Sequence, residues 1–214
     1  MNPRRAVGFA LLGLLGGAAA AQDTTATNAA ASAASASSVS GETLAGPALL
    51  KLLRAGGLVI YFRHTATDFS RRDDAMQGYD DCAHQRLLSA QGRADATLLG
   101  QQIRALRLPV DEVLASPMCR TLEHAKLAFR RATATPELRE SDGGDYPGLK
   151  RLLAKPVAAG RNRWIVGHGI PFRAVTGAPQ LAEGEAVLIR PGSTSWTLLA
   201  RITLDQWATL SPPR

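Results

Sequence analysis

Two arginines and two histidines stand close behind short apolar runs of this 214-residue chain. A guanidinium offers a planar fork of charge-assisted donors, and an imidazole can attack phosphorus or bind an oxyanion, so the set suits phosphoryl transfer. If the runs are parallel strands, their carboxyl ends meet at one edge of a sheet. The four residues are Arg63 and His64 after the run 58–62, Arg120 in the segment 116–121 after the run 112–115, and His168 after the run 163–166.

His64 has the surroundings of a nucleophile. Positive charge from Arg63 and Arg120 should lower the pKa of its imidazole and keep the ring neutral. A neutral ring could attack a phosphoryl group and form a phosphohistidine, which water then hydrolyses. A bound phosphate dianion should in turn favour the charged form of His168.

A metal site is the competing interpretation of the histidines. His64, His84, His124 and His168 lack the short spacings of zinc ligands, and no carboxylate recurs beside them. We therefore expect neither a metal nor another cofactor. His84 is expected in a loop, and His124, one helical turn after Arg120, has either a pocket or a packing role.

The apolar pattern alternates between strands and helices and predicts a three-layer α/β/α sandwich with a mostly parallel central sheet. Ser89 is expected to cap the long second helix, and a polar loop is expected at 132–148. Strands are predicted at 58–62, 112–116, 164–166, 186–189 and 196–202, and helices at 43–54, 89–106, 118–130 and 149–159.

The first residues predict export. A basic start, an apolar stretch shorter than a membrane span and small residues before Gln22 are typical of a cleaved signal peptide at 1–21. Residues 22–41 are rich in Ala, Ser and Thr and predict a disordered linker. The folded domain is expected at 42–214, with no stable membrane span once the signal is removed. The formal charge of +7 is scattered without a basic run among aromatics, so we expect no nucleic-acid partner.

Four segments resemble the histidine phosphatase superfamily, and within it the phosphoglycerate mutase-like branch. Residues 63–67 (Arg-His-Thr-Ala-Thr) resemble its Arg-His-Gly signature, and 116–120 (Ser-Pro-Met-Cys-Arg) its Ser-Pro-x-x-Arg segment. Residues 88–92 are similar to its Leu-Ser-x-x-Gly helix start, and 167–169 to the setting of its second histidine. The resemblance covers roughly residues 58–190 in the family's order.

The resemblance implies the family's α/β fold and assigns roles to the candidate residues. His64 would be the nucleophile, His168 a ligand of the phosphate, and Thr67 a further hydroxyl donor. Thr65 and Ala66 stand where the mutase-like branch has Gly and Glu, so its substrate does not carry over.

A general acid is needed because an alkoxide is a poor leaving group. Glu140 lies about where the mutase-like branch carries its acid and is the preferred candidate. No Asp follows His168 directly, which argues against the His-Asp acid phosphatase and phytase branch. The other candidates are Asp142, Asp145 and Glu183.

Cys82 and Cys119 are the only two cysteines of the chain. Export would place them in an oxidising compartment, where a disulfide between two loops of the pocket is expected, the alternative being two separate thiols.

The sequence thus predicts a periplasmic or secreted phosphatase that hydrolyses phosphomonoesters, with sugar phosphates, nucleotides and phosphorylated envelope glycolipid as candidate substrates. A noncatalytic anion-binding protein on the same fold and a phosphoglycerate mutase-type phosphotransferase are the alternatives. The oligomeric state stays open.

Overall fold

The computed structural model of the protein describes residues 46–210. The predicted signal peptide at 1–21 and linker at 22–41 lie outside the described residues, as do both ends of the domain predicted at 42–214. These boundaries stay predictions.

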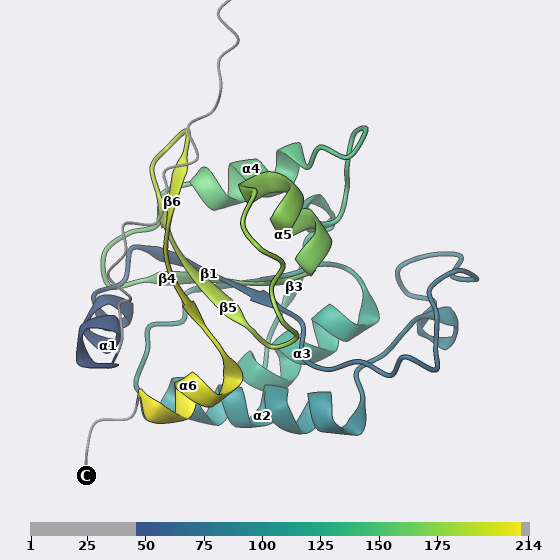
Figure 1. Ribbon diagram of the computed structural model, residues 1–214, viewed down its shortest axis with the longest axis horizontal. Coiled ribbons are helices and arrows are strands. Elements are labelled where there is room, and N and C mark those ends of the chain that lie inside the picture. Colours follow the sequence, from purple (N-terminus) through teal and green to yellow (C-terminus); the bar gives the residue numbers. More distant parts are fainter. Residues whose placement is uncertain (1–45, 211–214) are drawn as a thin grey trace, which may run out of the picture. The chain divides into compact units, whose positions relative to one another are not determined.

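The described residues form a six-stranded sheet with helices on both faces, as predicted (Figure 1). The strand order is β3-β2-β4-β1-β5-β6, and β5 runs antiparallel to both of its neighbours while the other pairs are parallel. The strands are β1 (Leu58–Arg63), β2 (Glu112–Ala115), β3 (Thr133–Ala134), β4 (Asn162–Gly167), β5 (Ala186–Pro191) and β6 (Trp196–Ile202). The helices are α1 (Gly46–Ala55), α2 (Ala90–Ala105), α3 (Cys119–Phe129), α4 (Pro147–Ala154), α5 (Gly169–Thr176) and α6 (Leu204–Thr209), with short 3-10 turns η1 (Cys82–His84) and η2 (Pro136–Leu138).

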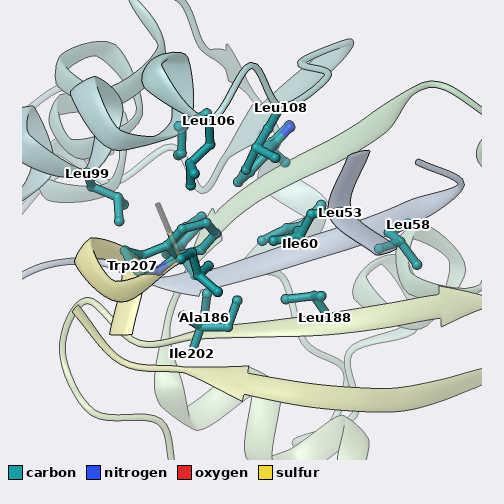
Figure 2. Close-up of a cluster of buried hydrophobic side chains, with 14 of the residues drawn as sticks. Leu53, Leu58, Ile60, Leu99, Leu106, Leu108, Ala186, Leu188, Ile202 and Trp207 are labelled. Carbon is teal, nitrogen blue, oxygen red and sulfur yellow. The ribbon is translucent and has the colours of Figure 1, made fainter. Parts of the chain in front are cut away.

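Alternating side chains of the central strands supply two separate hydrophobic clusters, one on each face of the sheet. Ile60 and Phe62 of β1 belong to the cluster that includes residues of α1, α2, α3 and α6 (Figure 2). Val59 and Tyr61 of the same strand belong to the cluster that includes residues of α4 and α5. Because successive side chains of a strand point to opposite faces, the hydrophobic stretch 58–62 of β1 is buried on both sides, as expected of a central strand.

The predicted cap of the second helix is confirmed. Ser89 precedes α2, and its side chain accepts a hydrogen bond of 3.0 Å from the backbone N–H of Gly92. This bond satisfies one of the free donors of the first helical turn.

Three short elements escaped the prediction from sequence. The two-residue strand β3 lies in the segment expected as a loop, and α5 and α6 have eight and six residues. Such short elements carry little periodicity and are stabilised by packing, here through Phe172 of α5 and Trp207 of α6, both fully buried. The fourth helix ends at Ala154 rather than at 159, ahead of Pro156.

Candidate active site

The site lies at the carboxyl ends of three neighbouring parallel strands. Val166 of β4 pairs with Phe62 of β1 on one side and with Ala115 of β2 on the other. The chain therefore leaves the sheet at one common level, and His64, Ser116 and His168 follow directly or within two residues. Two hydrogen bonds of the turns continue the ladder there, from His64 N–H to Gly167 O (3.1 Å) and from Ser116 N–H to Val166 O (3.0 Å).

His64 is buried, with its Nδ1 2.9 Å from the carbonyl oxygen of Thr65. A carbonyl can only accept, so Nδ1 carries the proton and the lone pair of the neutral ring lies on Nε2. Burial lowers the pKa of His64 to about 3, and the charges of Arg120 and Arg63 lower it further, against the Thr65 hydrogen bond that raises it. The ring is thus held neutral, in the form that a nucleophile needs.

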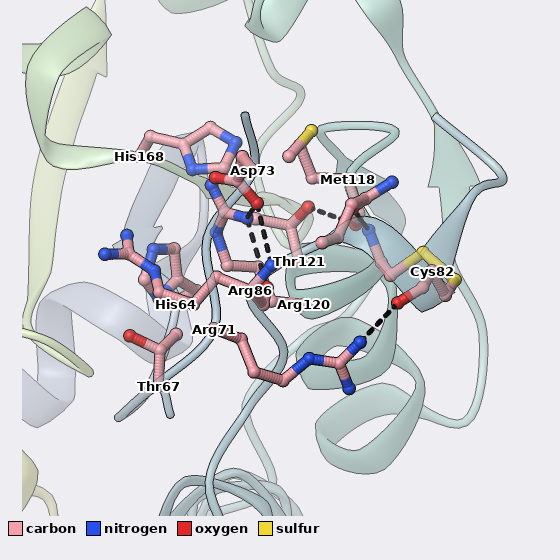
Figure 3. A network of polar contacts seen from close by, with 12 residues as sticks. His64, Thr67, Arg71, Asp73, Cys82, Arg86, Met118, Arg120, Thr121 and His168 are labelled. Atoms are coloured by element: carbon pink, nitrogen blue, oxygen red, sulfur yellow. Dashed lines mark hydrogen bonds and ion pairs between the residues drawn. A yellow bond between two sulfur atoms is a disulfide. The ribbon is translucent and has the colours of Figure 1, made fainter. Parts of the chain in front are cut away.

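His168 faces His64, with ring centroids 5.5 Å apart and an edge-on angle of 71° (Figure 3). Its Nε2 lies 2.8 Å from the hydroxyl oxygen of the fully buried Ser116. Burial, with a further contribution from Arg120, holds the pKa of His168 well below its usual range. A bound anion would reverse this effect, because its charge favours the imidazolium.

The side chain of Tyr61 fixes the backbone of His168 through two hydrogen bonds. Its hydroxyl donates to the carbonyl oxygen of His168 and accepts from the N–H of the same residue, both at 2.9 Å. The hydroxyl fills the space that a Cβ on Gly167 would need. Glycine at 167 is therefore required by this close approach, and the Gly-His segment and Tyr61 form one unit.

Arg120 lies in the first turn of α3 and is only 3% exposed. Its Nη1 donates to Asp73 Oδ1 at 3.1 Å and to the carbonyl oxygen of Arg86 at 3.2 Å. Its Nε is buried without a hydrogen-bond partner among the described residues. Burial lowers the pKa of Arg120, and Asp73 opposes that shift.

Arg63 is anchored on the loop before β5. Its Nη1 donates to Leu181 O at 2.7 Å, and its Nη2 pairs with Glu183 Oε1 at 3.4 Å. The hydroxyl of Thr67 donates to the same oxygen at 2.8 Å. Thr67 is therefore near the site, with its hydroxyl engaged by a carboxylate in this structure.

His124 lies on the same side of α3 as Arg120 but points into the protein. It is fully buried, and its Nδ1 accepts the backbone N–H of Thr65 at 3.2 Å. Its Nε2 therefore carries the proton, and this nitrogen is buried without a partner among residues 46–210. Burial lowers the pKa of His124 to about 3. Of the two roles left open from sequence, the structure shows packing with one directed contact.

The four candidate acids lie in different places. Glu183 Oε1 is 3.9 Å from His64 Nδ1, on the ring edge that faces away from Nε2. Glu140, Asp142 and Asp145 are exposed, and Asp145 pairs with Lys150. The structure gives the Glu140 carboxylate no hydrogen bond or ion pair within the described part, and its role as acid stays a prediction.

Cys82 and Cys119 form a disulfide, as predicted, with their Cα atoms 5.8 Å apart. The bridge joins η1 to the first residue of α3, next to Arg120. Gln85, fully buried, reinforces it by accepting the N–H of Cys119 at 2.9 Å. His84 is exposed in this loop, as expected, and contacts Asp81.

Within residues 46–210, no three His, Cys, Asp or Glu side chains are arranged to hold a metal ion. None of the helices described there is long and apolar enough to cross a bilayer. Sequence reasoning missed the contributions of Tyr61, Asp73 and Ser116. Only Ser116 had a signal, since it begins the Ser-Pro-x-x-Arg segment.

Several solved structures are similar to this chain at low sequence identity. They include the protein histidine phosphatase SixA complexed with tungstate (18% identity, TM-score 0.49, 69% of this chain and 97% of that chain). The putative phosphohistidine phosphatase SixA from Agrobacterium tumefaciens (17%, TM-score 0.49, 69% and 98%) and a putative alpha-ribazole-5'-P phosphatase from Escherichia coli (18%, TM-score 0.45, 68% and 95%) are also similar. No curated protein sequence matches the chain.

The sequence model of the histidine phosphatase superfamily (branch 1) matches residues 59–166, half of the chain. The match begins in β1 ahead of His64, includes Arg120 and ends in β4 just before His168. With two buried histidines and two arginines gathered at the ends of these strands, the chain belongs to the histidine phosphatase superfamily, branch 1.

Proposed function

We propose that the protein is an exported phosphatase that hydrolyses phosphomonoesters through a phosphohistidine on His64. The observation that carries this proposal is the hydrogen bond of 2.9 Å between His64 Nδ1 and Thr65 O. It leaves the lone pair on Nε2, in a site that also contains Arg63, Arg120 and His168. Cations around a neutral nucleophile are the arrangement that attack on a phosphoryl dianion requires.

The reaction has two displacements. His64 Nε2 attacks phosphorus, the bond from phosphorus to the ester oxygen breaks, and the departing alkoxide takes a proton to become an alcohol. Water then attacks the phosphohistidine, the P–N bond breaks, and inorganic phosphate leaves with His64 restored. Arg63, Arg120 and His168 would stabilise the charge on the equatorial oxygens in both steps.

We propose Glu140 as the proton donor for the alcohol. An in-line displacement expels the leaving group opposite Nε2, whereas Glu183 lies beside Nδ1, so Glu183 is on the wrong side of the ring. The neighbour of Glu140, Arg139, is close enough to lower the pKa of His168, after the larger effects of burial, Arg120 and His64. This contribution supports a position of the segment after η2 near the site, and we assign Glu183 to balancing the charge of Arg63.

Export is supported by the disulfide and by the predicted signal peptide at 1–21, because disulfides persist in oxidising compartments. A periplasmic or secreted enzyme would meet sugar phosphates, nucleotides or phosphorylated envelope glycolipid, and these are the proposed substrate classes. The cytosolic setting of glycerate phosphates argues against a mutase.

The test compares the oxidised protein with His64→Ala and His64→Asn on p-nitrophenyl phosphate from pH 4 to 8. We expect activity in the parent and a loss of at least about 10³-fold in both variants, because the covalent step is removed. Parent protein quenched in alkaline denaturant should carry phosphate in an acid-labile, base-stable linkage.

Equal rates in parent and variants would refute the nucleophile assignment. No hydrolysis by the parent, together with binding of inorganic phosphate, would instead identify an anion-binding protein.

A further inference from the structure

Asp73, which was not among the residues of the predicted site, forms an ion pair with Arg120. The carboxylate lies in the irregular segment 68–85 between β1 and α2, and its Oδ1 accepts from Arg120 Nη1 at 3.1 Å (Figure 3). Among the described residues, Asp73 is the one carboxylate within ion-pair distance of Arg120. The carboxylate of Asp73 could have one of three roles: it could support the guanidinium of Arg120, obstruct the binding of phosphate, or donate a proton.

The positions of the hydrogen-bond partners around the guanidinium of Arg120 distinguish among these roles. Arg120 has five N–H donors, and the two of Nη1 are directed to Asp73 Oδ1 and to the carbonyl oxygen of Arg86. The Nε donor is buried and has no partner in the described part of the chain, and no hydrogen bond from Nη2 is found there either. A buried donor without a partner is costly, and it marks the edge where a ligand belongs.

We infer that Asp73 is a positioning residue, which holds Arg120 by Nη1 so that the Nε–Nη2 edge receives two oxygens of the phosphoryl group. This inference rests on the proposed function. The edge formed by Nε and Nη2 has the fork geometry that binds an oxyanion through two parallel hydrogen bonds. A carboxylate that blocked the site would be expected on that edge.

A second hydrogen bond, at the same oxygen, holds the carboxylate of Asp73 in place. Its Oδ1 also accepts the backbone N–H of Arg86 at 2.8 Å, and the carbonyl oxygen of that residue is the second acceptor for Arg120 Nη1. Asp73 and Arg86 therefore form a short bridge across segment 68–85 that ends on the guanidinium.

The segment is tied to the helix that carries Arg120. The Cys82–Cys119 disulfide and the bond from Cys119 N–H to Gln85 join it to the first turn of α3. Gln85 also donates to Tyr79 O at 2.9 Å, within the same segment. Asp73 and Arg120 are thus anchored to a common frame, which gives the ion pair a defined direction.

The experiment measures binding of inorganic phosphate by calorimetry to the full oxidised protein, its Asp73→Ala and Asp73→Asn variants, and the control Asp74→Ala. Asp74 is the next residue, is exposed and pairs with Arg72, so it matches the charge and the segment without reaching Arg120. We expect Asp73→Ala to weaken phosphate binding by about 10-fold or more, since the receiving edge loses its orientation. Asp73→Asn keeps an acceptor for Nη1 and should bind within about 3-fold of the parent, as should Asp74→Ala.

A second readout follows the side-chain Nε–H resonance of Arg120 in ¹⁵N-labelled protein, assigned with Arg120→Lys. Phosphate should shift this resonance in the parent and in Asp73→Asn, and much less in Asp73→Ala. A thermal melt of each variant checks that it is folded. If Asp73→Ala does not fold, Asp73→Glu replaces it, because the extra methylene displaces the carboxylate and should also weaken binding.

Tighter phosphate binding by Asp73→Ala would overturn the inference and show that the carboxylate competes with the ligand. So would rates that fall in Asp73→Asn for an alkyl phosphate but not for p-nitrophenyl phosphate, the signature of a proton donor. Unchanged binding in Asp73→Ala would leave Asp73 without a role. Because binding needs no turnover, an inactive protein that still shows the Asp73 dependence would refute the proposed phosphatase and not this inference.

Discussion

The backbone of Thr65 links two buried histidines with opposite tautomers. Its carbonyl oxygen accepts from His64 Nδ1, and its N–H donates to His124 Nδ1. His64 is therefore protonated on Nδ1 and His124 on Nε2. The hydroxyl of Thr65 donates to Gly92 O at 2.8 Å, which ties the same residue to α2. The nucleophile is thus oriented by a backbone group that is itself held in place.

We predict that His124 contributes to catalysis through the backbone of Thr65. His124→Leu leaves the N–H of Thr65 without its acceptor and should lower kcat on p-nitrophenyl phosphate by about 10- to 100-fold, with a smaller change in KM. His124→Asn can return an acceptor near the position of Nδ1 and should recover part of the loss.

The tautomer of His64, read from the ¹⁵N shifts of its ring, should become mixed in His124→Leu alone. His84→Asn, at an exposed loop histidine, is the control. Full kcat in His124→Leu, or equal losses in the Leu and Asn variants, would contradict the prediction.

At the scale of the elements, the site depends on the parallel strands β1, β4 and β2. Their shared register places His64, His168 and Ser116 at one edge of the sheet. The hydroxyl of Tyr61 in β1 binds the backbone of His168, which follows β4. Segment 68–85 has no such support from the sheet. It is held by the disulfide, by Gln85 and by Arg71, which donates to Cys82 O and Ala83 O.

Reduction should therefore affect this segment first. The disulfide spans 37 residues, and its loss should lower the free energy of unfolding by about 3 to 4 kcal/mol. The test compares the oxidised parent with the double variant Cys82→Ser/Cys119→Ser, and with the parent in reductant. Urea unfolding measures the stability of each protein, and calorimetry measures its affinity for phosphate. We expect both stability and phosphate affinity to fall. An unchanged affinity in the folded double variant would show that the segment keeps its position without the bridge.

For the whole molecule, burial of three histidines couples stability to pH. Burial lowers the pKa of His64 and of His124 to about 3 and holds that of His168 well below its usual range. In the unfolded chain the pKa of each of these rings returns to about 6.5. Between these limits the unfolded state binds protons that the folded state does not, so the free energy of unfolding falls as the pH drops below about 6.5.

We predict that the free energy of unfolding falls, as the pH is lowered, by up to about 1.4 kcal/mol per pH unit for each of the three histidines. Urea unfolding between pH 7 and about 5, where most carboxylates stay ionised, measures this slope. His124→Asn removes one titrating ring and should flatten the slope by about one proton. A free energy of unfolding that stays constant from pH 7 to about 5 would contradict the prediction.

The sequence by itself determined the α/β class, five of the six strands described and the residues at the ends of β1, β2 and β4. Apolar runs and turn residues are local signals, and parallel strands bring their carboxyl ends together whatever the details of packing. Arg63, His64, Arg120 and His168 could therefore be named, and the disulfide expected, before the fold was known.

Only the tertiary structure decided how these side chains are held. It showed that Asp73 lies on Nη1 of Arg120, that His124 turns inward to Thr65, and that Glu183 lies behind His64. These facts depend on the path of irregular segments and on rotamers chosen by distant neighbours, for which a linear pattern has no period. The short β3, α5 and α6 escaped for the same reason, since contacts across the fold, rather than their own residues, stabilise them.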